Sequence, residues 1–116
     1  MSEKTKPMVI TDPEESKEYV LEYSRRTAIK VEQAGLDLNA IESKPMTMIP
    51  LLFWGAFLMH QPNVTKQQTD KILFEGLSGL SEDEIAYLGK LYAEPFQTLI
   101  SKEDKDANPR KMAVRF

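Results

Sequence analysis

The hydrophobic pattern is concentrated in one segment, residues 48–59, which has the sequence MIPLLFWGAFLM. It contains no charged side chain, and its only hydrogen-bonding side chain is the indole of Trp54. A surface helix shows one apolar stripe, whereas this segment is apolar on every side. It is also shorter than the roughly 20 residues that a membrane span needs. The pattern therefore predicts a central helix over 45–60 that is surrounded by protein, either its own chain or further copies of it.

Two residues inside this predicted helix are poor helix formers. Pro50 is tolerated if Thr47 is the N-cap, because the proline then occupies a position whose backbone N–H has no intrahelical partner. Gly55 costs about 1 kcal/mol relative to alanine in a helix interior. Such a cost is accepted where another segment comes very close, and we expect a second backbone to approach Gly55.

The segment before residue 24 has two interpretations. Thr11, Asp12 and Pro13 followed by two glutamates are typical of a helix start. Alternatively, residues 8–10 and 17–23 form a hairpin, because polar and apolar side chains alternate from Glu18 to Tyr23. We favour the hairpin, joined by a turn over 12–16. Residues 1–7 are polar, and we expect them to be loosely held.

Capping residues delimit three further helices. Ser24 begins a short helix that Gly35 ends. Thr65 and Gln68 have the spacing of a capping box, and the helix that they begin extends to about Gly76 with Ile72, Leu73 and Leu77 directed inward. A second box, formed by Ser81 and Glu84, begins a helix that Pro95 kinks or splits near Leu91.

The fold class that these elements predict is mainly α, with about four helices and a short N-terminal β-hairpin. One helical domain spans residues 1–101. Residues 102–116 begin with a charged stretch that lacks any hydrophobic period, and they predict a flexible tail.

Composition narrows the classes of partner. The net charge is -3, so a basic face for nucleic acid is not expected. Cysteine is absent, which excludes disulfides and thiolate chemistry. The first residues contain no long apolar stretch, so neither a secretory signal nor a membrane anchor is expected. We therefore expect a cytoplasmic protein.

Candidate chemistry is sparse. The single histidine, His60, follows the apolar helix, where it is expected to interact with the helix C-terminus. No phosphate loop, metal-ligand cluster or nucleophile–base pair is visible, so we expect no catalysis, no cofactor and no metal. The candidate contact residues for self-association or for a client protein are Phe53, Trp54, Phe57, Arg25 and Arg26. The plainer interpretation is that the aromatic residues form core and the arginines a solvated face.

Residues 17–100 resemble the tail assembly chaperones of long-tailed bacteriophages and prophages. The matching segments are YVLEYSRRT at 19–27, EQAGL at 32–36, PMTMIP at 45–50, LFWGAFL at 52–58 followed by His60, and LYAEPFQTL at 91–99. The hairpin turn of the resembling proteins is tighter and contains glycine, whereas this chain has DPEES at 12–16.

This resemblance implies a protein that binds no cofactor and coats the tape measure protein before the tail tube polymerises. It also implies a homo-oligomer, which an open spiral would satisfy, and recruitment of the tail tube protein through a longer frameshifted form. Two other function classes stay open. One is a small helical DNA-binding regulator, which the acidic pI of about 5.2 disfavours, and the other is a structural subunit of the tail.

Overall fold

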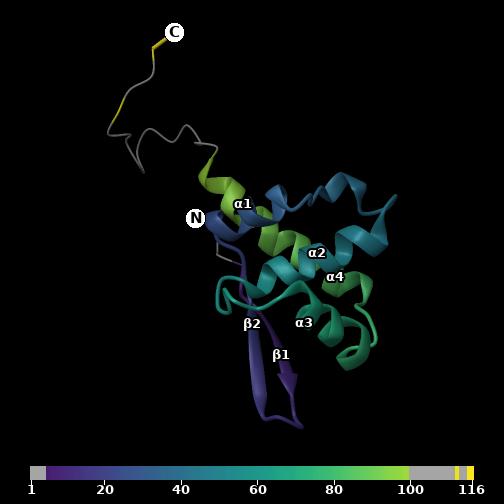
Figure 1. Ribbon diagram of the computed structural model, residues 1–116. Coiled ribbons are helices and arrows are strands. Elements are labelled where there is room, and N and C mark those ends of the chain that lie inside the picture. The colour runs from purple at the N-terminus through teal and green to yellow at the C-terminus, as the bar shows by residue number, and fades with distance from the viewer. Residues whose placement is uncertain (1–4, 100–111, 113–114) are drawn as a thin grey trace.

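An N-terminal hairpin followed by four α-helices makes up the computed structural model, which describes residues 5–99, 112 and 115–116 (Figure 1). The elements in chain order are strands β1 (Met8–Asp12) and β2 (Lys17–Leu21), helix α1 (Arg25–Gln33), the short 3₁₀ helix η1 (Leu38–Ala40), helices α2 (Pro45–Phe57) and α3 (Lys66–Lys71), the π-helical turn η2 (Ile72–Gly76), helix α4 (Glu82–Ala93) and the 3₁₀ helix η3 (Glu94–Thr98). The prediction of a mainly helical fold with a hairpin is confirmed.

The hairpin is antiparallel, and its closing pair is Asp12 with Lys17. Asp12 organises the turn, because its Oδ1 accepts the backbone N–H groups of Glu14 at 3.0 Å and Glu15 at 3.3 Å. Ser16 has a φ of 53°, the left-handed conformation for which glycine would be the usual choice. Asp12 therefore acts as a turn residue, and the interpretation of this segment as a helix start is wrong.

One face of the hairpin packs on the helices and the other does not. Met8 lies opposite Leu21, and Ile10 opposite Tyr19, and these four side chains join the core. Val9, on the opposite face, keeps 51% of its surface exposed. Figure 1 shows that the tip of the hairpin points away from the helices, so only its base is anchored.

Helix α1 begins and ends as its sequence predicts. The Ser24 hydroxyl accepts the backbone N–H of Thr27, and the Thr27 hydroxyl accepts the backbone N–H of Ser24. The two bonds form a capping box. At the other end, the N–H of Leu36 bonds the carbonyl of Val31 at 2.9 Å, and Gly35 has a φ of 109°. This pattern is a Schellman motif, which requires the left-handed conformation that glycine supplies.

Helix α2 begins at Pro45, the first residue of the predicted range, but with a different N-cap. Its N-cap is Lys44, and the N–H of Met48 bonds the Lys44 carbonyl at 2.9 Å. The prediction of Thr47 as the N-cap is wrong because Pro45, whose fixed φ suits the first helical position, already begins the helix. Pro50 consequently lies inside the helix, where it withholds one hydrogen bond from the exposed first turn. The helix ends at Phe57 rather than at His60.

The later helices have the predicted caps but different ends. Both capping boxes form, at Thr65 with Gln68 and at Ser81 with Glu84. Helix α3 changes into the π-helical turn at Ile72, and Leu77 is more than one-third exposed rather than directed inward. The helix α4 continues to Ala93 and then tightens into η3 at Glu94, just before Pro95, so the break lies beyond Leu91.

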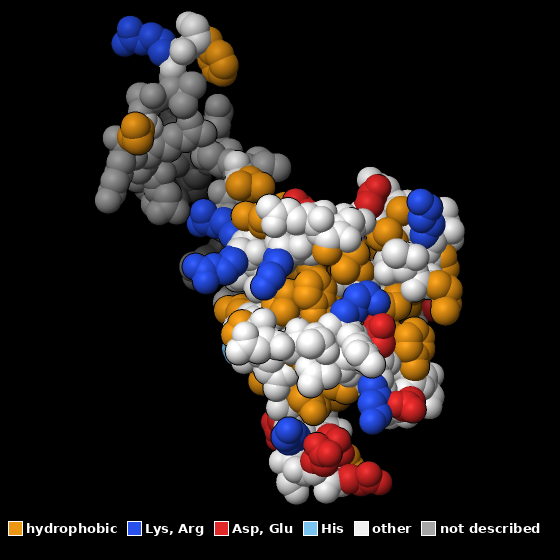
Figure 2. Space-filling view, in the orientation of Figure 1, with side chains coloured by type: hydrophobic (Ala, Val, Ile, Leu, Met, Phe, Trp, Pro, Cys, Tyr) orange, Lys and Arg blue, Asp and Glu red, His pale blue; other side chains and the backbone are white. Residues whose placement is uncertain are grey.

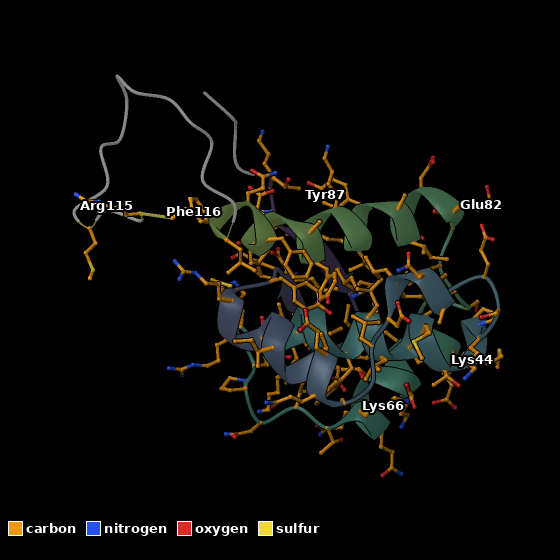
Figure 3. All side chains as sticks on the ribbon, turned by 90° about the horizontal axis from the view of Figure 1, so that it is seen from above. Lys44, Lys66, Glu82, Tyr87, Arg115 and Phe116 are labelled. Carbon is orange, nitrogen blue, oxygen red and sulfur yellow. The ribbon has the colours of Figure 1, made fainter. Side chains whose placement is uncertain are left out.

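The core surrounds α2, which packs against α1, α3, α4 and β2. Figure 3 shows side chains filling the space between α4 and the other helices. The chain covers its own apolar helix, with Met48 and Pro50–Phe53 buried together with Gly55–Leu58. Cover by further copies is therefore not needed to bury this segment. None of the helices in the described part of the chain has both the length and the apolar character that crossing a bilayer would demand.

The N-terminal segment is tied to α4 and η3 from residue 5 onward. Thr5 donates its backbone N–H and its hydroxyl to the Glu94 carboxylate, at 3.1 and 2.6 Å, and the Tyr87 hydroxyl donates to the Lys6 carbonyl. The expectation that residues 5–7 are loosely held is thus wrong. The predicted boundary at 101 and the predicted tail over 102–116 lie outside the described residues, apart from 112 and 115–116.

Candidate protein-binding surface

The predicted contact residues Phe53 and Phe57 lie in the core. Their exposed fractions are 0% and 1%, and their ring centroids are 5.0 Å apart in an edge-to-face arrangement. Tyr19 of the hairpin contacts the Phe57 ring at 5.6 Å. The two phenylalanines therefore hold the hairpin base against α2, and the tight packing predicted for them is confirmed.

Gly55 is the point of closest approach to α2. A Cβ atom at this position would lie 2.1 Å from Val31 Cγ1 and 2.3 Å from the Tyr23 hydroxyl oxygen. The Tyr23 hydroxyl needs this space because it donates a 2.6 Å hydrogen bond to the Leu52 carbonyl. The close approach that the sequence predicts does occur, but two side chains make it rather than a second backbone.

Two tyrosines form a buried pair next to this contact. The rings of Tyr23 and Tyr92 meet edge to face at 5.3 Å, and Tyr92 donates a 2.8 Å hydrogen bond to Glu32. Burial, and then the neighbouring Tyr92, raise the pKa of Tyr23 well above its ordinary value. Burial also raises the pKa of Tyr92, and its hydrogen bond to the Glu32 carboxylate adds to the effect. Both phenols stay neutral at neutral pH, and their hydroxyl groups donate hydrogen bonds within the packed domain.

Trp54 bridges α2 to the loop that follows it. Its indole N–H donates a 3.2 Å hydrogen bond to the Val64 carbonyl, and its ring is half-buried. Next to this loop lies an open groove of about 370 Å³ between β2 and α3. The groove is lined by Lys17, Tyr19, Gln61, Pro62, Asn63, Val64, Gln68 and Ile72. Its lining mixes amides with apolar groups and contains no carboxylate.

His60 pairs with a carboxylate instead of the end of its own helix. Its Nε2 lies 2.6 Å from Glu22 Oε1, and the Glu22 backbone N–H bonds the Ala56 carbonyl at 3.0 Å. These two contacts fasten the end of β2 to the end of α2. The residues are far apart in sequence, which is why the local pattern around His60 gave no sign of the pair.

Arg25 and Arg26 are the predicted contact residues that are exposed. Both lie in the first turn of α1, followed by the exposed residues Ile29 and Lys30. In the described part of the chain, neither arginine forms an ion pair. Of the five predicted contact residues, the two phenylalanines are thus buried, the tryptophan is half-buried and the two arginines are exposed.

Exposed apolar side chains occur on several separate elements. Those at least half exposed are Val9, Ile29, Met46, Phe74 and Leu99, together with the isolated Met112 and Phe116. Figure 2 shows apolar groups on the surface of the helical part, interrupted by charged and other polar atoms. From the sequence, the accessible apolar surface was expected at the aromatic residues of α2. The positions found here, which include Met46 in the first turn of that helix, were missed because single apolar residues among polar ones carry no strong pattern.

The described residues contain no group of three or more histidine, aspartate or glutamate side chains arranged to hold a metal ion. What they present is a small helical domain with a projecting hairpin, accessible cations on α1 and dispersed apolar contacts. The family model described as a domain of unknown function (DUF5055) matches residues 1–116, and the chain belongs to that family. No curated protein and no solved structure matches it.

Proposed function

We propose that this protein is a phage tail assembly chaperone that self-associates and coats the tape measure protein before the tail tube polymerises. The resemblance of residues 17–100 to such chaperones motivates the proposal. It places the protein in the cytoplasm of a bacterial host, with the tail tube protein as a second partner reached through a longer frameshifted form.

The observation that carries the proposal is the distribution of exposed apolar side chains. Val9, Ile29 and Phe74 lie on β1, α1 and η2, and each keeps half or more of its surface exposed. A long helical client would be held by many small contacts along its length, which separate apolar side chains on successive copies of the chaperone can supply. The closed core leaves the side chains of α2 from Met48 to Phe57 out of this binding surface, whereas Met46 in the first turn of α2 is 78% exposed.

The projecting hairpin favours self-association. Among the described residues, each strand has only one hydrogen-bonding neighbour, so the outer edges of both strands are unpaired. Unpaired edges that extend from a domain are common sites of contact between chains. A contact between different surfaces of two copies would repeat without closing, as a spiral around a client requires.

Co-expression with the tape measure protein tests the proposal. We expect the soluble fraction of the client to rise when the wild-type chain is present, and to fall by half or more with Phe74→Asp. Gln67→Asp, at an exposed position on the neighbouring helix α3, serves as the matched control and should act like the wild type. A client that stays insoluble with the wild-type chain would contradict the chaperone function. Retardation of duplex DNA by the isolated protein would favour a regulator.

A further inference from the structure

The first turn of α1 carries charges of the sign that a helix start disfavours. A helix N-terminus has a partial positive charge, so cations there are unfavourable, whereas acids are favourable. Helix α4 follows the rule with Glu82, Asp83 and Glu84 in its first turn. Helix α1 has Arg25 and Arg26 in this place and no acid at all. An anionic partner at this point would be attracted both by the arginines and by the helix.

The exposed side of α1 has the composition of a binding surface. Arg25 and Arg26 lie four and three residues before Ile29, and Lys30 follows Arg26 by four, so these side chains are neighbours on the helix. Ile29 is 53% exposed, with the cations Arg25 and Arg26 on the preceding turn and Lys30 next to it in the sequence. We call these four residues the α1 face. It suits a partner that combines a small apolar group with carboxylates.

The tip of the hairpin has this complementary composition. Pro13, Glu14, Glu15 and Glu18 are all exposed, and we call them the hairpin tip. Lys17 approaches Glu15 only to 4.0 Å, with both side chains largely in solvent. In Figure 1 the tip lies at one end of the molecule and α1 lies toward the other, and Figure 2 shows acidic groups gathered at the end where the hairpin projects.

We infer that the hairpin tip of one copy docks on the α1 face of the next copy, with Pro13 against Ile29 and Glu14 and Glu15 against Arg25 and Arg26. The inference rests on the proposed function and names the surface through which the protein self-associates. One chain cannot bring its own tip to its own α1, because α1 begins just beyond the base of the hairpin and the tip points away from it (Figure 1). Since the two surfaces differ, the contact is head-to-tail and leaves a free tip and a free face at the ends of every assembly.

The size and charge of this contact set its expected strength. A hairpin tip buries less than the roughly 800 Å² per partner of a standard interface, so the association should be reversible. Much of it is electrostatic, and the screening length shortens from about 10 Å at 0.1 M salt to about 3 Å at 1 M. Growth of the assembly should therefore be favoured by low salt and by high protein concentration.

A charge exchange tests the inference. The first variant is Arg25→Glu with Arg26→Glu, and the second is Glu14→Lys with Glu15→Lys. In sedimentation velocity at low salt, the wild type should form species that grow with concentration, and each double variant alone should sediment as a monomer. An equimolar mixture of the two variants should recover growth, because each reversed surface then meets its complement.

The variants are chosen so that misfolding does not explain a loss of assembly. Acids in place of Arg25 and Arg26 are favourable for the helix start, and Glu14 and Glu15 contribute backbone rather than side-chain bonds to their turn. Glu42→Lys with Glu75→Lys changes the net charge by the same +4 as Glu14→Lys with Glu15→Lys, at exposed positions outside both surfaces, and it should assemble like the wild type.

Three outcomes would overturn the inference: a wild type that stays monomeric at every concentration, double variants that assemble as the wild type does, or a mixture that stays monomeric. The client experiment separates these from failure of the proposed function. If the double variants still assemble and the tape measure protein stays soluble, the chaperone function stands and the docking surface is a different one. If the charge exchange works but the client stays insoluble, the docking surface is correct and the chaperone function is wrong.

Discussion

Helix α2 and the hairpin differ in how far their apolar side chains are exposed to a partner. Helix α2 is the most apolar segment of the chain, yet its side chains from Met48 to Leu58 are buried or half-buried by the chain itself. The hairpin contains fewer apolar residues, but Val9 on its outer face is half exposed and its tip is free of contacts with the helices. High local hydrophobicity thus marks the core of this protein, and the accessible surface lies on elements of mixed composition.

The largest difference in the free energy of unfolding is expected between two phenylalanine truncations, one at a buried position of α2 and one at an exposed position. Phe57→Ala removes a fully buried ring that contacts both Phe53 and Tyr19, and it should lower the free energy of unfolding by about 3–5 kcal/mol. Phe74→Ala, at a half-exposed position, should cost less than about 1 kcal/mol. Urea unfolding monitored by circular dichroism measures both. Equal losses would mean that the burial of α2 is not what distinguishes the two sites.

Substitution of Gly55 should have the next largest effect. Although alanine is the better helix former by about 1 kcal/mol, the new Cβ would overlap Val31 and the Tyr23 hydroxyl. Overpacking of this kind costs typically 1–3 kcal/mol, and we expect Gly55→Ala to be destabilising in net terms. Gly89→Ala is the control, because a Cβ there meets no atom within 4 Å, and it should be neutral or stabilising. A more stable Gly55→Ala protein would refute the close approach.

The tyrosine pair predicts a loss of stability in alkali. The folded state raises the pKa of Tyr23 and of Tyr92 above the unfolded value of about 10, so the folded chain binds more protons once pH exceeds that value. The contribution of these two tyrosines to the free energy of unfolding is therefore constant below about pH 9 and falls as pH rises above 10. Unfolding curves from pH 8 to 11 measure the slope, and Tyr92→Phe should make it shallower. If Tyr92→Phe leaves the slope unchanged, groups other than Tyr92 cause the loss of stability in alkali.

The outer face of the hairpin should show the smallest effect on stability. Val9→Thr preserves the β-branched shape at a position where the side chain is half in solvent, so the free energy of unfolding should change by less than about 0.5 kcal/mol. Thermal unfolding provides the measurement. A substantial loss would indicate that the outer face is covered in the isolated protein.

The sequence predicted the features that depend on neighbouring residues. Three helix starts, at Ser24, Thr65 and Ser81, and the helix end at Gly35 follow from side chains within a few positions, and all are present. The hairpin follows from the alternation around Tyr19. Each of these signals acts through hydrogen bonds or backbone conformations that form within one turn of the chain.

The features that the sequence missed depend on distant residues. The bond from Tyr23 to Leu52, the pair of Glu22 with His60 and the attachment of Thr5 to Glu94 each join separate elements. The cover of α2 likewise depends on how closely α1, α3 and α4 pack, which composition does not specify. For the binding surface, the arginines were identified because charge is visible in sequence, whereas half-exposed residues such as Ile29 and Phe74 became evident only from the fold.

Amide hydrogen exchange, compared between dilute monomer and concentrated assembly, tests the central claim most directly. The account predicts that α2 is strongly protected in both states and to the same degree, because its own chain already covers it. Added protection on assembly should be confined to the hairpin and to the first turns of α1. An increase in protection across α2, with no change at the hairpin or α1, would contradict the account and return the binding surface to the apolar helix.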